Sequence, residues 1–307
     1  MNAFTDAIMA ALGYAPQDPE PNVITRFATS PRSSKRDGWC ILFADRRGGT
    51  FGCHRTGIQD TWQAERQRSM TKADRLAQAV AIAEATKLRH REQSALRAEK
   101  LKKWSPVWEK AQPLADCAAT RYLERRGFSA LTGRWPPSLR CTRLDYWHDG
   151  NLLGTFPVML AGVQGADGRM VALHRTFLNE DGSKANVPNV KKLTGAFGMV
   201  MGASVRLFAA QRRLGVSEGV ETAIAACLGS GVPTWAAVSA SGLERFQWPA
   251  QVRELFIFGD CDESRRGQVA SESLAQRASR AGLSVRVLTP GEVGRDWADV
   301  YAEAVPL

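Results

Sequence analysis

The last third of the chain alternates short apolar runs with longer segments of helical periodicity. Four apolar runs are predicted strands: Leu214–Ser217, Thr234–Val238, Leu255–Gly259 and Ser284–Leu288. Three segments between and after them are predicted helices: Val220–Leu228, Gly267–Ala281 and Trp297–Ala304. Parallel strands that are buried on both faces are continuously apolar, and each reaches the next through a crossover helix. The pattern therefore predicts an α/β domain built on a parallel sheet with crossover helices.

The middle of the chain has a different pattern, in which strands are joined by polar turns. Phe156–Val163 and Met170–Phe177 are predicted strands, and a polar turn over Asn179–Lys184 follows them. Nearer the N-terminus, residues 22–62 are predicted to form strands and turns, with strands at Trp39–Phe43 and Thr50–Cys53. Because a short helix is also predicted over Asp116–Arg126, we expect an α+β fold before residue 211.

A long basic helix is predicted between these strand-rich segments, over Arg66–Lys110. No Gly or Pro interrupts it before Pro106, and it holds 12 Lys or Arg against 5 acids. Apolar residues recur along it at spacings compatible with a stripe on one face: Leu76, Val80, Leu88, Leu96 and Leu101. A solvated connector between domains and a helix that follows phosphates both fit this composition.

Length and charge narrow the class of protein. The 307 residues suggest about two globular domains at roughly 150 residues each. The net charge of +10 divides into +12 before residue 211 and −2 after residue 210. The basic part predicts a polyanionic partner, with nucleic acid ahead of a membrane surface. Because no apolar stretch approaches a membrane span and Met1–Tyr14 lacks a secretory signal, we expect a cytoplasmic protein with no membrane partner.

Acidic residues follow three of the predicted parallel strands: Glu218, then Asp260 and Asp262, then Asp296 and Asp299. The carboxyl ends of parallel strands meet at one edge of a sheet. Two carboxylates about 4 Å apart repel by roughly 4 kcal/mol at an effective dielectric of about 20, and a divalent cation compensates that repulsion. Oxygen ligands suit Mg²⁺ or Mn²⁺. For each acid taken alone, a helix cap or a solvated side chain is the simpler alternative.

The N-terminal segment contains candidate residues for two other kinds of site, a zinc site and a surface for single-stranded nucleic acid. Cys40, Cys53 and His54 lack a fourth donor and the spacing of a zinc knuckle, so we expect buried cysteines in a small sheet and no zinc. Cations interleaved with aromatic residues would suit single-stranded nucleic acid: Arg26, Arg32, Lys35, Arg36, Arg46, Arg47 and Arg55 with Trp39, Phe43, Phe51 and Trp62. A core made of the same aromatic residues is the alternative.

Three motifs in the last third carry a resemblance to a known domain. In chain order they are Leu214-Gly-Val-Ser-Glu218-Gly219-Val-Glu221, Phe256-Ile-Phe-Gly-Asp260-Cys-Asp262 and Gly294-Arg-Asp296-Trp297-Ala-Asp299. The segment from about residue 211 to residue 305 resembles a Toprim domain, most closely that of plasmid and phage primases. The stretch from His174 through Lys191-Lys192-Leu-Thr-Gly to Val205-Arg206-Leu207 resembles the subdomain that precedes Toprim in those proteins.

The resemblance implies a DNA primase, a nucleotidyltransferase that makes short primers from nucleoside triphosphates on single-stranded DNA in plasmid- or phage-type DNA replication. It implies that Asp260 and Asp262 hold a divalent metal, with Glu218 as a further ligand or general base and Asp296 completing the cluster. Glu221 lies one helical turn beyond Glu218. It is expected to cap a helix or to pair with another side chain, and not to take part in catalysis.

Phosphate contacts to template or nucleotide are expected from cations that cluster on loops beside strands: Arg175, Lys184, Lys191 and Lys192, near His174. Solvated loop charges are the alternative for these cations. No Gly-x-x-x-x-Gly-Lys-Ser/Thr motif occurs, so we expect a separate replicative helicase as partner. The acids also fit a Toprim-type metal-dependent nuclease, and the basic part fits a non-catalytic single-stranded-DNA-binding accessory subunit of a helicase.

These patterns predict four parts along the chain. Residues 1–65 would form a small strand-rich module like a degenerate zinc ribbon, and residues 66–112 a basic helical linker. Residues 113–210 would form the primase-type N-subdomain, and residues 211–307 the Toprim domain.

Overall fold

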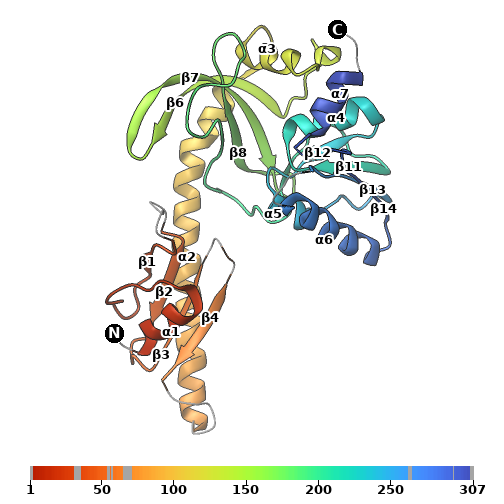
Figure 1. Cartoon of the computed structure of the whole chain (residues 1–307). Helices are drawn as coiled ribbons and strands as arrows, with labels where there is room; N and C mark the ends of the chain where they lie inside the picture. The colour runs from red at the N-terminus through yellow and green to blue at the C-terminus, as the bar shows by residue number, and fades with distance from the viewer. Residues whose placement is uncertain are drawn as a thin grey trace. The chain divides into compact units, whose positions relative to one another are not determined.

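The structure is a computed structural model that describes residues 3–30, 36–53, 56, 58–64, 71–261, 265–292 and 294–304. The chain forms two compact units, Met1–Leu96 and Arg97–Leu307 (Figure 1). In the described part of the chain, no helix combines the length and the apolar composition needed to cross a membrane.

The first unit is a four-stranded antiparallel sheet with a helix on each face. The strands pair in sequence order: β1 (Thr25–Phe27), β2 (Gly38–Leu42), β3 (Gly48–Cys53) and β4 (Gln59–Gln63). Helix α1 (Ala3–Leu12) packs on one face, where Phe4 and Ile8 join a small core with Phe51. The other face packs against helix α2 (Lys72–Lys110) through Ala85. Every residue of β2 and β3 is therefore buried.

The predicted apolar stripe of the long helix is wrong. Leu76, Val80, Leu96 and Leu101 are exposed, with Leu76 at 68%. The helix instead meets the sheet through Ala81, Ile82 and Ala85, which pack with Ile41 and Phe43. Small alanine side chains let the helix approach the sheet closely, and the guanidinium of Arg89 covers the ring of Trp39 at 4.7 Å from its centroid.

Three of the four aromatic residues considered for base stacking form the core of this unit, and the fourth, Trp62, is partly buried against it. Trp39, Phe43 and Phe51 have at most 4% of their surface exposed. Cys40 and Cys53 are also buried, and burial raises the pKa of the Cys40 thiol to about 12. His54 and three of the predicted nucleic-acid-binding cations, Arg32, Lys35 and Arg55, lie outside the described residues.

The second unit is built on one ten-stranded sheet. Its parallel part consists of β11 (Arg213–Ser217), β12 (Thr234–Ala236), β13 (Glu254–Phe258) and β14 (Ser284–Leu288). Its antiparallel part consists of β5 (Gln112–Pro113), β6 (Leu139–His148), β7 (Asn151–Gln164), β8 (Met170–Phe177) and β9 (Lys191–Leu193). The short strand β10 (Ser204–Val205) pairs antiparallel with β7 and with β12 and so joins the two parts. The predicted fold class, α+β followed by α/β with a parallel sheet, is confirmed.

Helices cover both faces of the parallel part. On one face lie α4 (Val220–Ser230) and α7 (Trp297–Ala304); on the other lie α5 (Ala240–Glu244) and α6 (Arg266–Arg280). Helix α5 was not predicted, because five residues are too few to show a helical period. Three of the predicted strands are observed within one residue of their predicted ends, Thr234–Val238 ends two residues early, and α7 has the predicted bounds.

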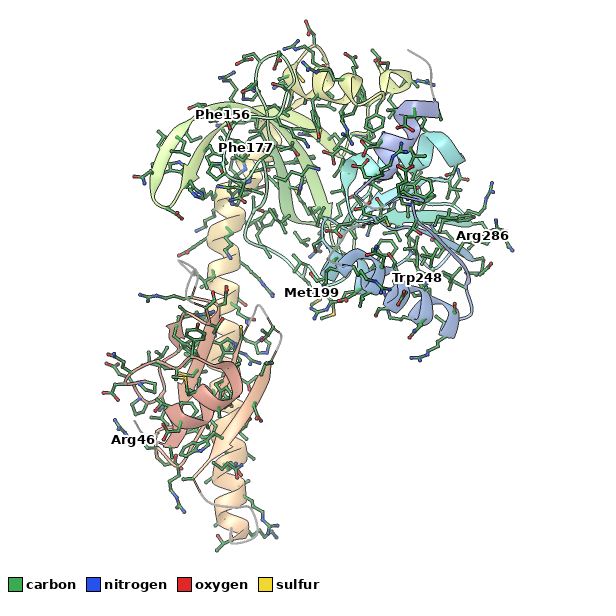
Figure 2. All side chains as sticks on the ribbon, in the orientation of Figure 1. Arg46, Phe156, Phe177, Met199, Trp248 and Arg286 are labelled. Atoms are coloured by element: carbon green, nitrogen blue, oxygen red, sulfur yellow. The ribbon has the colours of Figure 1, made fainter. Side chains whose placement is uncertain are left out.

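Helices also cover both faces of the antiparallel part of the sheet. The last turn of α2 packs on one face of the sheet, where Val107 and Trp108 contact a core that contains Tyr146 and Phe177. Phe156 and Phe177 lie beside this end of α2 (Figure 2). Helix α3 (Ala118–Arg125) packs on the opposite face, against β7.

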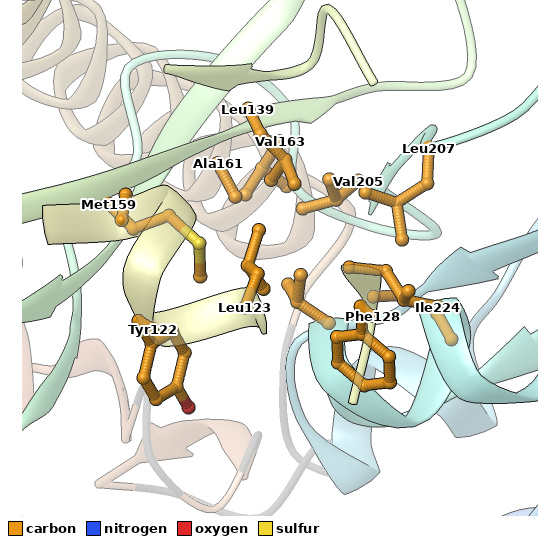
Figure 3. Packing of buried hydrophobic residues seen from close by; sticks show 14 of the residues in the cluster. Tyr122, Leu123, Phe128, Leu139, Met159, Ala161, Val163, Val205, Leu207 and Ile224 are labelled. Carbon is orange, nitrogen blue, oxygen red and sulfur yellow. The ribbon is translucent and has the colours of Figure 1, made fainter. Parts of the chain in front are cut away.

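One hydrophobic core runs beneath α3, α4 and α7 without a break at the predicted boundary between residues 210 and 211. Leu123 of α3 and Ile224 of α4 belong to the same cluster as Met159, Ala161 and Val205 of the sheet (Figure 3). Because this core is shared, α3 and α4 are held at fixed positions over the sheet.

The turn between β8 and β9 offers a test of how closely α3 is packed. Gly182 has φ +81°, and a Cβ there would lie 2.6 Å from the backbone nitrogen of Tyr122. We expect Gly182→Ala to lower the free energy of unfolding by about 3 kcal/mol, since a positive φ costs an alanine about 1 kcal/mol and overpacking adds about 1–3 kcal/mol. Urea unfolding measures this difference.

Gly150 provides the matched control for this substitution. It lies in the β6–β7 hairpin turn with φ +82°, and a Cβ added there would have no atom within 4 Å. Gly150→Ala should therefore lower the free energy of unfolding only by the cost of the positive φ, about 1 kcal/mol. Equal losses for the two variants would show that Gly182 does not pack closely on α3.

Candidate active site

A cavity of about 360 Å³ lies at the carboxyl ends of β11 and β13. It is lined from α3, β8, β9, the start of α4 and the segment before α7. The lining residues are Tyr122, Arg126, His174, Lys184, Lys191, Leu193, Glu218, Gly219, Val220, Glu221, Thr222, Val238, Asp260 and Asp296. The cavity therefore combines carboxylates that follow the parallel strands with cations from the antiparallel part.

Glu218 and Asp260 reach the cavity because their strands are neighbours. Strands β11 and β13 pair in parallel with Ser217 opposite Phe258, so the residues that follow them leave the sheet at the same edge. Both side chains are partly buried. Asp262, the other predicted metal ligand on this loop, lies outside the described residues. Within the described ranges, no three carboxylate, imidazole or thiol groups gather closely enough to hold an ion, so the metal-binding and catalytic roles stay predictions.

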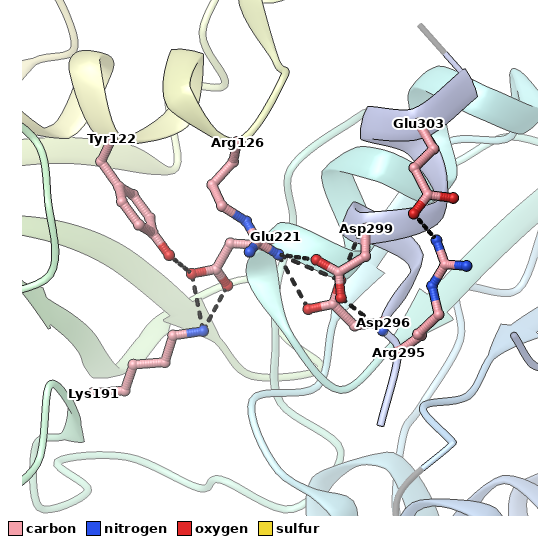
Figure 4. A network of polar contacts seen from close by, with 8 residues as sticks. All are labelled: Tyr122, Arg126, Lys191, Glu221, Arg295, Asp296, Asp299 and Glu303. Carbon is pink, nitrogen blue, oxygen red and sulfur yellow. Dashed lines mark hydrogen bonds and ion pairs between the residues drawn. The ribbon is translucent and has the colours of Figure 1, made fainter. Parts of the chain in front are cut away.

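Asp296 lines the same cavity but is already engaged. Its Oδ1 accepts the backbone N–H of Asp299 at 2.9 Å, which caps helix α7. The Arg126 guanidinium forms an ion pair with it at 3.1 Å and lies 3.6 Å from Asp299 (Figure 4). The helix-cap role that the sequence left open is thus the observed one, and metal binding by Asp296 stays a prediction.

The loop that carries Asp296 is tied to the end of β13. The backbone N–H of Gly294 donates to the carbonyl of Cys261 at 2.7 Å, and the Trp297 indole donates to the carbonyl of Gly259 at 3.2 Å. The Trp297 ring also packs edge-on against Phe258. These contacts hold Asp296 beside Asp260 although the two are far apart in sequence.

Backbone strain lies directly beside Glu218. Val238 has φ +58°, a left-handed conformation that β-branched residues avoid, and its N–H donates to the Glu218 carbonyl at 2.9 Å. Such conformations cost about 1–3 kcal/mol and persist only where neighbouring contacts hold them. The turn after β12 is therefore held in place against the turn after β11.

Glu221 forms the most buried polar contact of the cavity. It is 3% exposed, and its carboxylate accepts hydrogen bonds from the Tyr122 hydroxyl at 2.6 Å and from the Lys191 ammonium at 2.9 Å (Figure 4). The expectation that Glu221 pairs is confirmed. The interaction joins the first turn of α4 to α3 and to β9.

The protonation states in this contact follow from its geometry. Burial raises the pKa of the Glu221 carboxyl, but the Lys191 charge and the hydrogen bonds from Tyr122 and Lys191 outweigh burial and hold it well below its usual range. Burial and the neighbouring carboxylate raise the pKa of Tyr122 strongly. Glu221 is therefore ionised and Tyr122 protonated at neutral pH.

His174 lines the cavity from β8 beside the same pair. Burial lowers its pKa to about 4; the Glu221 carboxylate opposes this shift, and the charges of Lys191 and Arg175 add to it. Its Nδ1 is buried and makes no hydrogen bond within the described part of the chain. His174 therefore presents a neutral imidazole at neutral pH.

The expectation that the predicted phosphate-binding cations cluster at one site is wrong for Arg175 and Lys192. Successive residues of a strand point to opposite faces of a sheet. Strand β9 pairs with β8 so that Lys191 lies opposite Thr176 and Lys192 opposite Arg175. Lys191 and Lys184 accordingly line the cavity, whereas Arg175 and Lys192 lie on the face that α2 covers.

Sequence reasoning missed Tyr122 and Arg126 as cavity residues and assigned no role to His174. Tyr122 and Arg126 are four residues apart, so they share one face of the predicted helix. That spacing was the available signal, but it does not show which face of the helix turns toward the acids.

Removal of the Tyr122 hydroxyl should weaken the Glu221 contact. A hydrogen bond to a charged group contributes about 1.5–3 kcal/mol, so we expect Tyr122→Phe to lower the free energy of unfolding by about 2 kcal/mol. Tyr301→Phe is the matched control, since Tyr301 also packs against this core but its hydroxyl makes no hydrogen bond with the described residues. Denaturant titration of both variants checks this, and equal effects would contradict it.

Burial of neutral His174 should make stability depend on pH. Its folded-state pKa of about 4 lies below the ordinary 6.5, so the unfolded chain takes up a proton first as the pH falls. His174 therefore contributes stability above pH 6.5 that is lost between pH 6.5 and 4, at up to about 1.4 kcal/mol per pH unit.

The measurement is the free energy of unfolding between pH 4 and 7 for the wild type and for His174→Gln. The variant should have a shallower slope in this range. His148→Gln, at the end of β6, should keep the wild-type slope, and a wild-type slope in His174→Gln would show that His174 is not buried in its neutral form.

Comparisons with known proteins were made with the whole chain. Residues 98–207 match a family model described as "Domain of unknown function (DUF7146)", and residues 213–305 match the model of the Toprim domain. No curated protein sequence matches the chain.

Several solved structures are similar to part of this chain. A DNA primase domain from Pseudomonas aeruginosa is 16% identical with a TM-score of 0.45, and the match covers 66% of this chain and 74% of that one. The primase fragment of the bacteriophage T7 primase-helicase is 16% identical with a TM-score of 0.38, covering 60% and 65%. The RNA polymerase domain of Mycobacterium tuberculosis primase DnaG is 14% identical with a TM-score of 0.40, covering 68% and 76%.

The match to the Toprim model begins at the first residue of β11 and ends beyond α7. It includes all three acidic motifs and the four parallel strands. Residues 213–305 of this chain therefore belong to the Toprim domain family.

Proposed function

We propose that this protein is a DNA primase of the plasmid or phage type, which synthesises short primers from nucleoside triphosphates on a single-stranded DNA template. The observation that carries the proposal is the joint lining of one cavity by Glu218 and Asp260 of the Toprim domain and by Lys184 and Lys191 of the preceding part. Carboxylates together with ammonium groups are what phosphoryl transfer requires, because it depends chiefly on positioning and charge neutralisation.

The donor set of the cavity fits a divalent metal ion of the Mg²⁺ or Mn²⁺ type. Glu218 and Asp260 offer only oxygen atoms, which these ions prefer. Asp262 would contribute a third carboxylate in this proposal. When bound, such an ion would neutralise phosphate charge and lower the pKa of the attacking hydroxyl.

In this proposal, side chains of this chain accept the proton and bind the phosphates. Glu218, which lines the cavity, would accept the proton of the attacking hydroxyl. Lys184 is exposed at the cavity and would bind phosphate oxygens. Lys191 has 41% of its side chain exposed while its ammonium is held by Glu221, so it would meet phosphates in a fixed orientation, with Tyr122 and Glu221 as positioning residues.

The direct test is primer synthesis on a single-stranded template with labelled nucleotides and Mg²⁺ or Mn²⁺. Asp260→Asn and Glu218→Gln should each lower the rate about 100-fold or more. Glu272→Gln removes an exposed carboxylate from α6, outside the cavity, and should leave the rate unchanged. Synthesis by Asp260→Asn at the wild-type rate would contradict the assignment of the site.

Two other functions remain distinguishable in the same experiment. A Toprim-type nuclease would degrade the template with metal and without nucleotides. A non-catalytic accessory subunit of a helicase would bind single-stranded DNA and give no heat on calorimetric titration with Mn²⁺. For a primase we expect heat from the wild type and none from Asp260→Asn. A separate replicative helicase is the partner that this proposal requires.

A further inference from the structure

Two thiols from separate parts of the sequence meet beside a second cavity, which has a volume of about 330 Å³. Cys117, at the start of α3, and Cys141, on β6, both line it. Both side chains pack against the core beneath α3, and both stay partly exposed. Among the described residues, this cavity shares no lining residue with the candidate active site, so the thiols form a separate feature of the second unit.

The two sulfur atoms are close enough to affect each other's ionisation. Burial raises the pKa of the Cys141 thiol to about 12, and its contact with the Cys117 thiol adds to this shift. Cys141 lies on the same face of β6 as Leu139, which packs in the core beneath α3. The two thiols are therefore neighbours between the sheet and the start of the helix, as a disulfide requires.

The backbone at the start of α3 allows a sulfur–sulfur bond to form. Cys117 precedes the first helical residue and has an extended backbone, with φ −147° and ψ 170°. Its N–H donates to the Thr120 hydroxyl at 3.1 Å, and this hydroxyl donates to the Cys117 carbonyl at 2.7 Å. These bonds hold the backbone of Cys117 to the first turn of α3, so a rotation of its side chain leaves the helical hydrogen bonds intact.

The charged side chains around the two thiols suit a small zwitterionic molecule. Arg121 pairs with Asp116 at 2.7 Å, and Arg143 pairs with Glu180. All four side chains line the cavity and are exposed to solvent. Exposed ion pairs are weak and exchange partners readily, so these groups can bind the carboxylates and the ammonium group of a short peptide.

We infer that Cys117 and Cys141 form a reversible dithiol–disulfide pair, which a small peptide disulfide of the glutathione type oxidises from this cavity. Because the Cys141 thiol is protonated at neutral pH, the Cys117 sulfur attacks first. It bonds to one sulfur of the peptide disulfide and releases the first peptide as a thiol. The Cys141 sulfur then attacks the Cys117 sulfur, forms the internal disulfide and releases the second peptide as a thiol. Two protein thiols are oxidised, one disulfide is reduced, and both protons leave on the peptide thiols.

The new bond ties the start of α3 to β6. Tyr122 and Arg126 reach the candidate active site from this end of the chain's α3 segment, so oxidation restricts the movement of one wall of that site. The inference is independent of the proposed function, because thiol content, mass and unfolding are measured without primer synthesis.

The test is incubation of the reduced full chain with oxidised glutathione, followed by mass spectrometry of the intact protein and of its peptides. The wild type should lose two hydrogen atoms and two of its six thiols, and the linked peptides should contain Cys117 and Cys141. Closing this loop should raise the urea midpoint of unfolding by about 1 M relative to the reduced protein. Dithiothreitol should restore the reduced mass and midpoint.

Single variants separate the two steps. Cys141→Ser should stop at the mixed disulfide and gain the mass of one glutathione on Cys117. Cys117→Ser should form neither a mixed disulfide at Cys141 nor an internal one, and serine is itself favoured at a helix start. Cys227→Ser is the matched control, because Cys227 is a partly exposed cysteine of α4 outside this cavity. It should form the disulfide as the wild type does.

The role of the charged lining is tested with Arg121→Gln combined with Arg143→Gln. This double variant should react about fivefold more slowly with oxidised glutathione and at the wild-type rate with the uncharged bis(2-hydroxyethyl) disulfide. Equal rates for the variant and the wild type with glutathione would overturn the binding of a peptide in the cavity. Six thiols left unreacted, a disulfide between other cysteines, or an unchanged urea midpoint would overturn the dithiol pair itself.

Discussion

The buried carboxylate of Glu221 is the interaction on which the arrangement of the cavity depends. It belongs to the Toprim domain, whereas its partners, Tyr122 and Lys191, belong to the part before it. An ionised carboxylate that loses its partners in a protein interior costs several kcal/mol, so α4 is stable in this position only with α3 and β9 in place. Because α3 is fixed in this way, Arg126 reaches Asp296 at the start of α7.

The ten-stranded sheet determines which of the neighbouring cations can act together. Lys191 and Lys192 are adjacent in sequence, yet strand geometry sends them to opposite faces. On the cavity face Lys191 is balanced by Glu221, and on the other face Lys192 lies over an aromatic ring with no carboxylate partner among the described residues. The alternation of side chains along β9 thus places a charge-balanced site on one face of the sheet and a surface with excess positive charge on the other.

Strand β10 has only two residues, yet it makes the two parts of the second unit one structural body. Its pairing with β7 and β12 continues the sheet from the antiparallel to the parallel part. Val205, which is fully buried, belongs to the core shared by α3 and α4. The cavity therefore lies within one continuous framework, and its cationic and acidic walls cannot be repositioned without disruption of a common core.

The sequence by itself determined the four parallel strands and the helices α4, α6 and α7 of the Toprim domain, and the edge of the sheet at which its acids emerge. Apolar runs and helical periods are local properties, which is why α7 was predicted with its observed bounds and why Glu218 and Asp260 were both placed after parallel strands. Only the tertiary structure decided that Leu76, Val80, Leu96 and Leu101 of α2 would be exposed. It also decided that Asp296 would cap α7 and that Tyr122 and Arg126 would reach acids 99 and 170 residues away. These contacts depend on which face of a helix packs on the sheet, and that choice is made by the packing of the whole core and not by any local pattern.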